Sequence, residues 1–130
     1  MKIMVCYDGG DAAKEAMKVA KEHAKAFGAS VEVVTALQKG LEDEVEKIQA
    51  AEKELEYAQS FFEDAGISCN KHLLIHGLTS GEDLAQFAQD HKVDQVFIGV
   101  KKRSKVGKLV FGSTAQFVIL ETDCPVVSVK

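Results

Sequence analysis

The sequence predicts a single α/β domain spanning residues 1–130, a three-layer α/β/α sandwich around a five-stranded parallel sheet. Three observations lead to this prediction. The chain has 130 residues, of which 46% are hydrophobic, so one core can form without metal or disulfide support. Short apolar runs rich in branched residues alternate with longer segments of helical periodicity. The chain has one proline and no tryptophan, and this composition leaves little room for linkers or low-complexity segments.

The first half of the chain is expected to form two strands and two helices. The run "KIMVCY" at residues 2–7 is apolar and is stopped by "DGG", which is typical of a buried strand entering a turn. Small and apolar residues recur at helical spacing over residues 11–27, and Gly28 lies where a C-terminal cap belongs. Residues 29–37 are branched and predict a second strand, whereas residues 41–65 predict an amphipathic helix.

The next segments continue the alternation. Residues 67–75 predict a third strand, and residues 79–91 predict a helix with a buried apolar stripe. Thr79 and Glu82 have the spacing of a capping box at the start of this helix. Residues 93–100 are again apolar and branched, so they predict a fourth buried strand.

The last part of the chain predicts one more helix and one more strand. Residues 112–122 should form a helix that begins at Gly112 or Ser113, because Ser113 and Gln116 have capping-box spacing. Proline ends that helical region, and residues 125–130, "PVVSVK", predict the final strand.

Strands that alternate with helices imply a parallel sheet covered on both faces. With right-handed crossovers, this order gives a doubly wound, flavodoxin-like (Rossmann-like) fold of strand order 3-2-1-4-5. Ligands of such sheets bind beyond the carboxyl ends of the strands, where the winding reverses. Here the reversal falls between the first and fourth strands, which end at Asp8 and Gly99.

The positive charge of the chain is concentrated in one segment. The formal net charge is −4, which argues against attraction of the whole protein to nucleic acid or to an acidic membrane surface. Five basic residues nevertheless fall within eight positions: Lys101, Lys102, Arg103, Lys105 and Lys108. A local function should explain this segment.

This basic segment connects the expected switch point to a helix N-terminus, and the combination favours an anion-binding site. The first turn of a helix presents unpaired N–H groups and the positive end of the dipole. Gly112 would let a phosphate approach closely, and Ser113 and Thr114 would add hydroxyl donors. Lys101 would add charge, and Arg103 could hold two phosphate oxygens at once.

Three stretches together resemble the universal stress protein family, over essentially the whole chain. They are the opening "VCYDGG", the segment "HGLTSGEDLAQFAQDHKVDQVFIGV" and the closing "GSTAQFVILETDCPVVSVK". Members that bind ATP carry Gly-x-x-Gly, nine residues, and then Gly-Ser or Gly-Thr. In this chain Gly99, Gly112 and Ser113 have that spacing, but Lys102 replaces the second glycine.

The resemblance implies an adenine-nucleotide site and a stress-response adaptor. The ligand would be ATP or AMP, alone or with Mg²⁺, bound rather than rapidly turned over. Asp8 with Tyr7 would contact the adenosine part, and Ala36 would contact adenine. With the basic residues discussed above, the predicted nucleotide-binding residues are Tyr7, Asp8, Ala36, Gly99, Lys101, Arg103, Gly112, Ser113 and Thr114.

Several alternatives remain open at this stage. Lys102 would block close backbone approach, so the segment could instead be a solvated basic loop in a family member that works through protein contacts. Nucleic acid is disfavoured because the basic run has no interleaved aromatic residues for base stacking. Slow ATP hydrolysis has low support, because no general base can be identified. The resemblance also implies a homodimer formed by pairing of the final strands.

Other classes of protein are excluded by missing features. Neither a P-loop nor a dinucleotide-binding glycine motif is present. A response-regulator receiver would need paired acids after the first strand, whereas this chain has Asp8 alone. His72 and His76 would lie about 13 Å apart on a strand, too far to share a metal. The opening residues lack the apolar core of a signal peptide or a membrane span, which predicts a cytoplasmic protein.

Cysteine usage agrees with that location. The chain has three cysteines and no Cys-x-x-Cys spacing. We expect Cys6, Cys69 and Cys124 to be small buried apolar side chains rather than redox centres.

Overall fold

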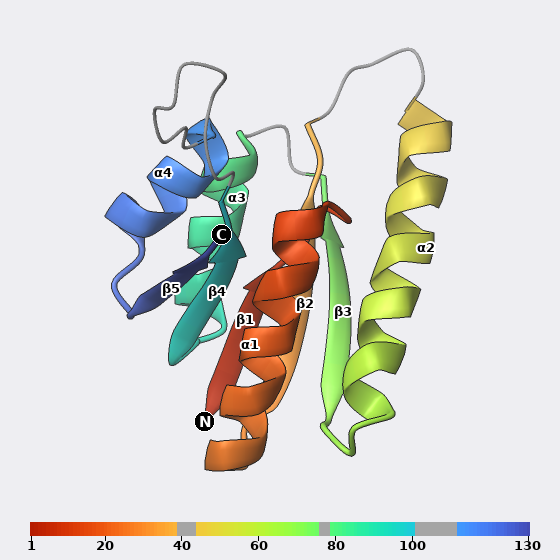
Figure 1. The fold of residues 1–130 in the computed structure, drawn as a ribbon. Helices are drawn as coiled ribbons and strands as arrows, with labels where there is room; N and C mark the ends of the chain where they lie inside the picture. The colour runs from red at the N-terminus through yellow and green to blue at the C-terminus, as the bar shows by residue number, and fades with distance from the viewer. Residues whose placement is uncertain (39–43, 76–78, 101–111) are drawn as a thin grey trace.

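The computed structural model describes residues 1–38, 44–75, 79–100 and 112–130, which form a three-layer α/β/α sandwich (Figure 1). Strands and helices alternate along the chain as predicted. In chain order they are β1 (Lys2–Cys6), α1 (Asp11–Phe27), β2 (Ser30–Ala36), α2 (Glu44–Glu63), β3 (Cys69–Leu74), α3 (Ser80–Asp90), β4 (Gln95–Gly99), α4 (Ser113–Glu121) and β5 (Val126–Val129).

The sheet has five parallel strands in the order β3-β2-β1-β4-β5, which confirms the predicted topology. β1 lies at the centre, where Ile3 is in register with Val31 of β2 and with Gln95 of β4. The winding reverses on either side of β1. The carboxyl ends of β1 and β4 therefore meet at the switch point expected from the sequence.

Each face of the sheet carries its own hydrophobic core. α1 and α2 cover one face, and α3 and α4 cover the other (Figure 1). Tyr7, Phe62 and Phe97 are the largest fully buried side chains of the first core. Small alanines on α1 let that helix lie close to the sheet, as its alanine-rich stripe predicts. The second core contains Met4 and Val96 together with apolar residues of α3 and α4.

The ends of the helices confirm two predicted caps, Gly28 after α1 and Thr79 before α3, and correct a third. Thr79 is the N-cap of α3, and its hydroxyl oxygen accepts a hydrogen bond from the Glu82 N–H at 3.2 Å. The capping box expected at Ser113 and Gln116 is wrong, because Gly112 is the N-cap of α4 and makes no side-chain cap hydrogen bond. Ser113 is thus the first helical residue, and its hydroxyl is not used as a cap.

The cysteines are free thiols, but only two of them are buried as predicted. Cys6 and Cys69 are buried, whereas Cys124 is only partly covered. Burial raises the pKa of both the Cys6 and the Cys69 thiol to about 12. These two side chains are therefore neutral at physiological pH. Across the described ranges, no helix has the length and apolar character needed to cross a bilayer.

The core position of Phe62 can be tested by truncation. Phe62 is fully buried, so Phe62→Ala should lower the free energy of unfolding by about 3–5 kcal/mol, measured by urea denaturation. Phe27→Ala is the matched control, because Phe27 is 62% exposed, and should cost less than about 1 kcal/mol. Similar losses in the two variants would contradict this assignment of the core.

Candidate functional site

A large cavity of about 1360 Å³ lies at the carboxyl ends of β1, β2 and β4. Its lining includes the starts of α1, α3 and α4 and one side of α2. Seven of the predicted nucleotide-binding residues line it together: Tyr7, Asp8, Ala36, Gly99, Gly112, Ser113 and Thr114. The other two, Lys101 and Arg103, lie outside the described residues, as does Lys102.

One end of the cavity is formed by the N-terminus of α4. A side-chain Cβ placed on Gly112 would meet no heavy atom of the described residues within 4 Å, so these residues leave the approach to the helix end open. Ser113 is exposed and Thr114 is partly exposed beside it. The free N–H groups of the first turn and the helix dipole favour an anion at this position.

Gly99 has a packing role that its place in the motif did not reveal. A Cβ on this residue would lie 2.4 Å from the Ala12 carbonyl carbon and 2.6 Å from the Ala13 nitrogen. The backbone of α1 therefore passes directly over the end of β4, and only glycine fits between them. This contact brings the start of α1 close to the switch point.

Asp8 lies on the turn between β1 and α1. Its Oδ1 accepts a hydrogen bond from the Gly10 N–H at 2.9 Å, and Gly9 takes a positive φ of 82°. The aspartate thus shapes the turn that it occupies. Asp8 is exposed, and its carboxylate remains at the rim of the cavity, where it can accept hydrogen bonds from a ligand.

Tyr7 connects the end of β1 to α2. Its ring is 1% exposed, and its phenol donates a hydrogen bond to Glu54 Oε2 at 3.2 Å. Its carbonyl accepts a hydrogen bond from Thr35 Oγ1 at 2.6 Å. Burial and the neighbouring Glu54 carboxylate raise the pKa of the Tyr7 phenol above its usual value. Tyr7 is therefore a fixed, neutral hydrogen-bond donor in the wall of the cavity.

Ala36 lies at the end of β2, where its carbonyl accepts a hydrogen bond from Ser80 Oγ at 3.2 Å. This bond joins β2 to the start of α3. The small Ala36 side chain leaves space in the cavity, and Leu37 continues the wall on the same side.

Two parts of the cavity lining were not identified from the sequence. The first is the side of α2 formed by Lys47, Ala50, Ala51 and Glu54, which are spaced at i, i+3, i+4 and i+7. The signal was an alanine pair between charged residues in the first half of the helix. The second is Lys130, which follows β5 and lines the cavity near the paired residues Gly99 and Val129. Because β5 is parallel to β4, its carboxyl end reaches the same edge of the sheet.

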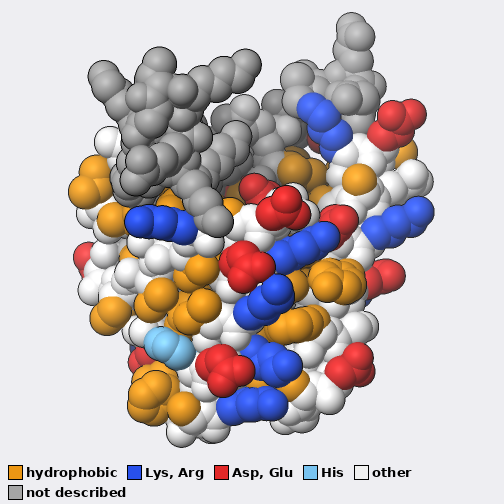
Figure 2. Space-filling view, viewed as in Figure 1, with side chains coloured by type: hydrophobic (Ala, Val, Ile, Leu, Met, Phe, Trp, Pro, Cys, Tyr) orange, Lys and Arg blue, Asp and Glu red, His pale blue; other side chains and the backbone are white. Residues whose placement is uncertain are grey.

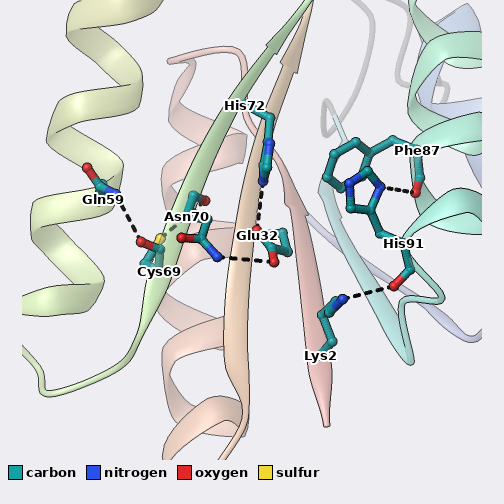
Figure 3. A network of polar contacts seen from close by, with 8 residues as sticks. All are labelled: Lys2, Glu32, Gln59, Cys69, Asn70, His72, Phe87 and His91. Carbon is teal, nitrogen blue, oxygen red and sulfur yellow. Dashed lines mark hydrogen bonds and ion pairs between the residues drawn. The ribbon is translucent and has the colours of Figure 1, made fainter.

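The described histidines, His23, His72 and His91, have contacts away from this cavity, whereas His76 lies outside the described residues. His72 Nε2 lies 2.7 Å from Glu32 Oε2, and Asn70 donates to the other carboxylate oxygen at 3.3 Å (Figure 3). The His91 ring stacks on Phe87 with centroids 3.7 Å apart. Within the ranges that the structure describes, no three His, Cys, Asp or Glu side chains are grouped to hold a metal ion.

Comparison with known proteins gives consistent matches over the full chain. Residues 1–130 match the model of the Universal stress protein family. The chain is 34% identical to a universal stress protein of Thermus aquaticus, from the 3′ region of a QAH/OAS sulfhydrylase, over 98% of this chain and 97% of that protein. The structure of a universal stress protein from Archaeoglobus fulgidus superposes with a TM-score of 0.92 and 36% identity, covering 100% and 98% of the two chains.

A second Archaeoglobus fulgidus structure is a complex of the universal stress protein with dAMP. It superposes with a TM-score of 0.84 and 32% identity, again covering 100% of this chain and 98% of the other.

The close contact at Gly99 predicts a strong effect of any side chain there. Gly99→Ser should lower the free energy of unfolding by about 1–3 kcal/mol, because its Cβ would overlap the α1 backbone. Gly112→Ser introduces the same side chain into open space at an N-cap, where serine is favourable, and should cause no loss. Chemical denaturation of both variants measures the difference, and an unchanged Gly99→Ser would refute the packing role.

Proposed function

The chain belongs to the universal stress protein family, and on that premise we propose that it binds an adenine nucleotide, ATP or AMP, in the cavity at the switch point. The observation that carries this proposal is the convergence of the α4 N-terminus, the Asp8 turn and Ala36 on one cavity. The dAMP complex of the Archaeoglobus fulgidus relative, which is 32% identical, supports an adenine nucleotide as the ligand.

The two ends of the cavity suggest how the nucleotide would lie. The phosphates would be at the α4 N-terminus, where free N–H groups and the hydroxyls of Ser113 and Thr114 favour negative charge. Asp8 is an acceptor for ribose hydroxyls, and it would repel phosphates. The base would then extend toward Ala36 and the alanine pair of α2, which offer a small apolar surface to a flat ring. Mg²⁺, when present, would be carried by the phosphates of ATP.

We propose a binding protein rather than an enzyme, acting as a nucleotide-responsive stress adaptor in the cytoplasm. Catalysis of phosphate hydrolysis needs a base placed to activate water. No histidine is among the described residues that line the cavity, and the Asp8 carboxylate already accepts the Gly10 N–H.

The second candidate function is that of a family member that binds no nucleotide and acts through protein contacts. Lys102, which replaces the second glycine of the motif, favours this alternative.

We further propose that the protein is a homodimer formed through β5, as its edge position favours. The carbonyls of Pro125 and Val129 accept hydrogen bonds from Val96 of β4 and from Val100 directly after it. Because backbone groups alternate in direction along a strand, the N–H and C=O of Ser128 face away from β4. They are available to pair with the same strand of a second copy.

The position of the phosphates can be tested by adding a negative charge at Ser113. Ser113→Asp should weaken AMP binding about tenfold and ATP binding more, because the carboxylate repels phosphate, while adenosine binding stays within about twofold. An acidic residue in the first helical turn is favourable, so the fold is expected to be retained. Calorimetric titration with the three ligands measures the effect.

Ser60→Asp is the matched control, since it adds the same charge at an exposed position of α2 and should leave all three affinities unchanged. Equal losses for adenosine and ATP in Ser113→Asp would contradict the phosphate position. No binding of ATP or AMP to the unaltered protein at millimolar concentration would instead favour the second candidate function.

The proposed dimer predicts a specific effect of proline at position 128. Ser128→Pro removes an N–H that faces away from β4, so dimerisation should weaken about tenfold or more while the monomer stays folded. Sedimentation velocity at micromolar concentration measures the association, and circular dichroism checks the fold. Ser128→Val keeps the N–H and should still form dimers. A monomeric unaltered protein would exclude this arrangement.

A further inference from the structure

A second hollow, separate from the nucleotide cavity, lies between α3 and α4. We call it the α3–α4 groove; its volume is about 510 Å³, and it shares no described lining residue with the first cavity. The two helices touch where Gly81 meets Phe117, because a Cβ on Gly81 would lie 2.8 Å from the Phe117 Cβ. The groove continues from this contact toward the C-terminal ends of both helices, as far as Val93 and Cys124.

The walls of the groove are regular helix faces. Glu82, Ala85, Gln86 and Gln89 of α3 follow the i, i+3, i+4, i+7 pattern of one helix face. Phe117 and Glu121 are one turn apart on α4. At 1.5 Å per residue, the α3 wall from Glu82 to Gln89 is roughly 10 Å long, which matches about two turns of another helix.

The floor of the groove is apolar and contains small side chains. Ala88 and Val93 are buried at its base, and Ala85 and Phe117 are partly exposed to it. Small residues such as Ala85 permit close approach of another helix.

The charges around this floor are predominantly negative. Glu82, Glu121 and Asp123 line the groove, against one lysine, Lys92, among the described lining residues. α3 and α4 both end here, and neither has a basic residue in its last turn. Their C-terminal dipole ends therefore add to the negative potential. A complementary partner must carry positive charge on both sides of an apolar stripe.

We infer that the α3–α4 groove is a docking surface for an amphipathic helix of a partner protein. The contacting part of the helix would be about two turns long, with alanine or leucine facing Ala85 and Ala88 and with lysine or arginine facing Glu121 and Asp123. Docking at this surface leaves the nucleotide cavity open, so it does not depend on the proposed nucleotide binding. It would give an adaptor a second, independent contact.

The inference can be tested with a model ligand and the 130-residue protein labelled with ¹⁵N. The probe is a blocked leucine–alanine–lysine peptide of about four helical turns, and its control has glutamate in place of every lysine. Backbone amide shifts should change along α3 and α4 only with the lysine peptide, and the affinity should fall as salt rises. Shifts that spread over α1 and α2, or binding of the glutamate peptide, would overturn the inference.

Matched variants separate the groove from general charge attraction. Glu121→Gln combined with Asp123→Asn should weaken peptide binding about fivefold to tenfold. Glu22→Gln combined with Asp64→Asn removes the same charge from the opposite side of the molecule, where lysines and acidic residues are interspersed (Figure 2). This control should bind as the unaltered protein does. Equal weakening would show attraction by net charge alone and would contradict the assignment.

Steric closure of the groove gives a second, independent readout. Ala85→Lys places a long cation over the floor and should abolish measurable peptide binding, whereas Ala26→Lys, at an exposed position of α1, should not. Thermal unfolding of both variants checks that the fold is retained. If a second copy of the chain occupied the groove instead, Ala85→Lys would shift the sedimentation coefficient of the protein without any peptide, and the inference of a partner helix would fail.

Discussion

The close approach of the α1 backbone to the end of β4 is the contact on which the cavity depends. At Gly99 the two backbones meet without room for a side chain, and the alanines of α1 keep the rest of that helix near the sheet. The turn containing Asp8 is thereby placed beside the switch point, opposite the N-terminus of α4. The hydrogen-bond acceptors of the Asp8 turn and the donors at the α4 N-terminus therefore face the same cavity. They do so because the backbones of α1 and β4 are in close contact at Gly99.

Much of this arrangement could be predicted because it follows from patterns among residues that are close together in the sequence. Alternating strand and helix periods imply a parallel sheet, and right-handed crossovers restrict its strand order to few choices. Asp8 and Gly99 could be assigned to one edge because carboxyl ends of parallel strands coincide there. The cap at Thr79 was evident because the hydroxyl and its N–H partner are three residues apart and need no tertiary contact.

Other features were not visible because they arise only when distant segments meet. Glu54 joins the site through Tyr7, which is 47 residues away in the sequence. Lys130 joins the site because β5 pairs in parallel with β4, which brings the end of β5 to the same edge of the sheet. The predicted start of α4 at Gly112 or Ser113 includes the observed one, but the capping box at Ser113 is wrong, since both residues are acceptable N-caps and local sequence cannot choose between them. The packing role of Gly99 required knowledge of what crosses above it.

The buried thiol of Cys6 bears on how this protein would behave under oxidative conditions. Cys6 lines the cavity, and burial raises the pKa of its thiol to about 12, so the side chain is a neutral thiol at pH 7. Peroxides attack the thiolate rather than the thiol, so this side chain should resist oxidation. Cys124, which is free and only partly covered, is more accessible to an oxidant than Cys6, so the lining of the cavity would keep its chemistry when a more exposed thiol is oxidised.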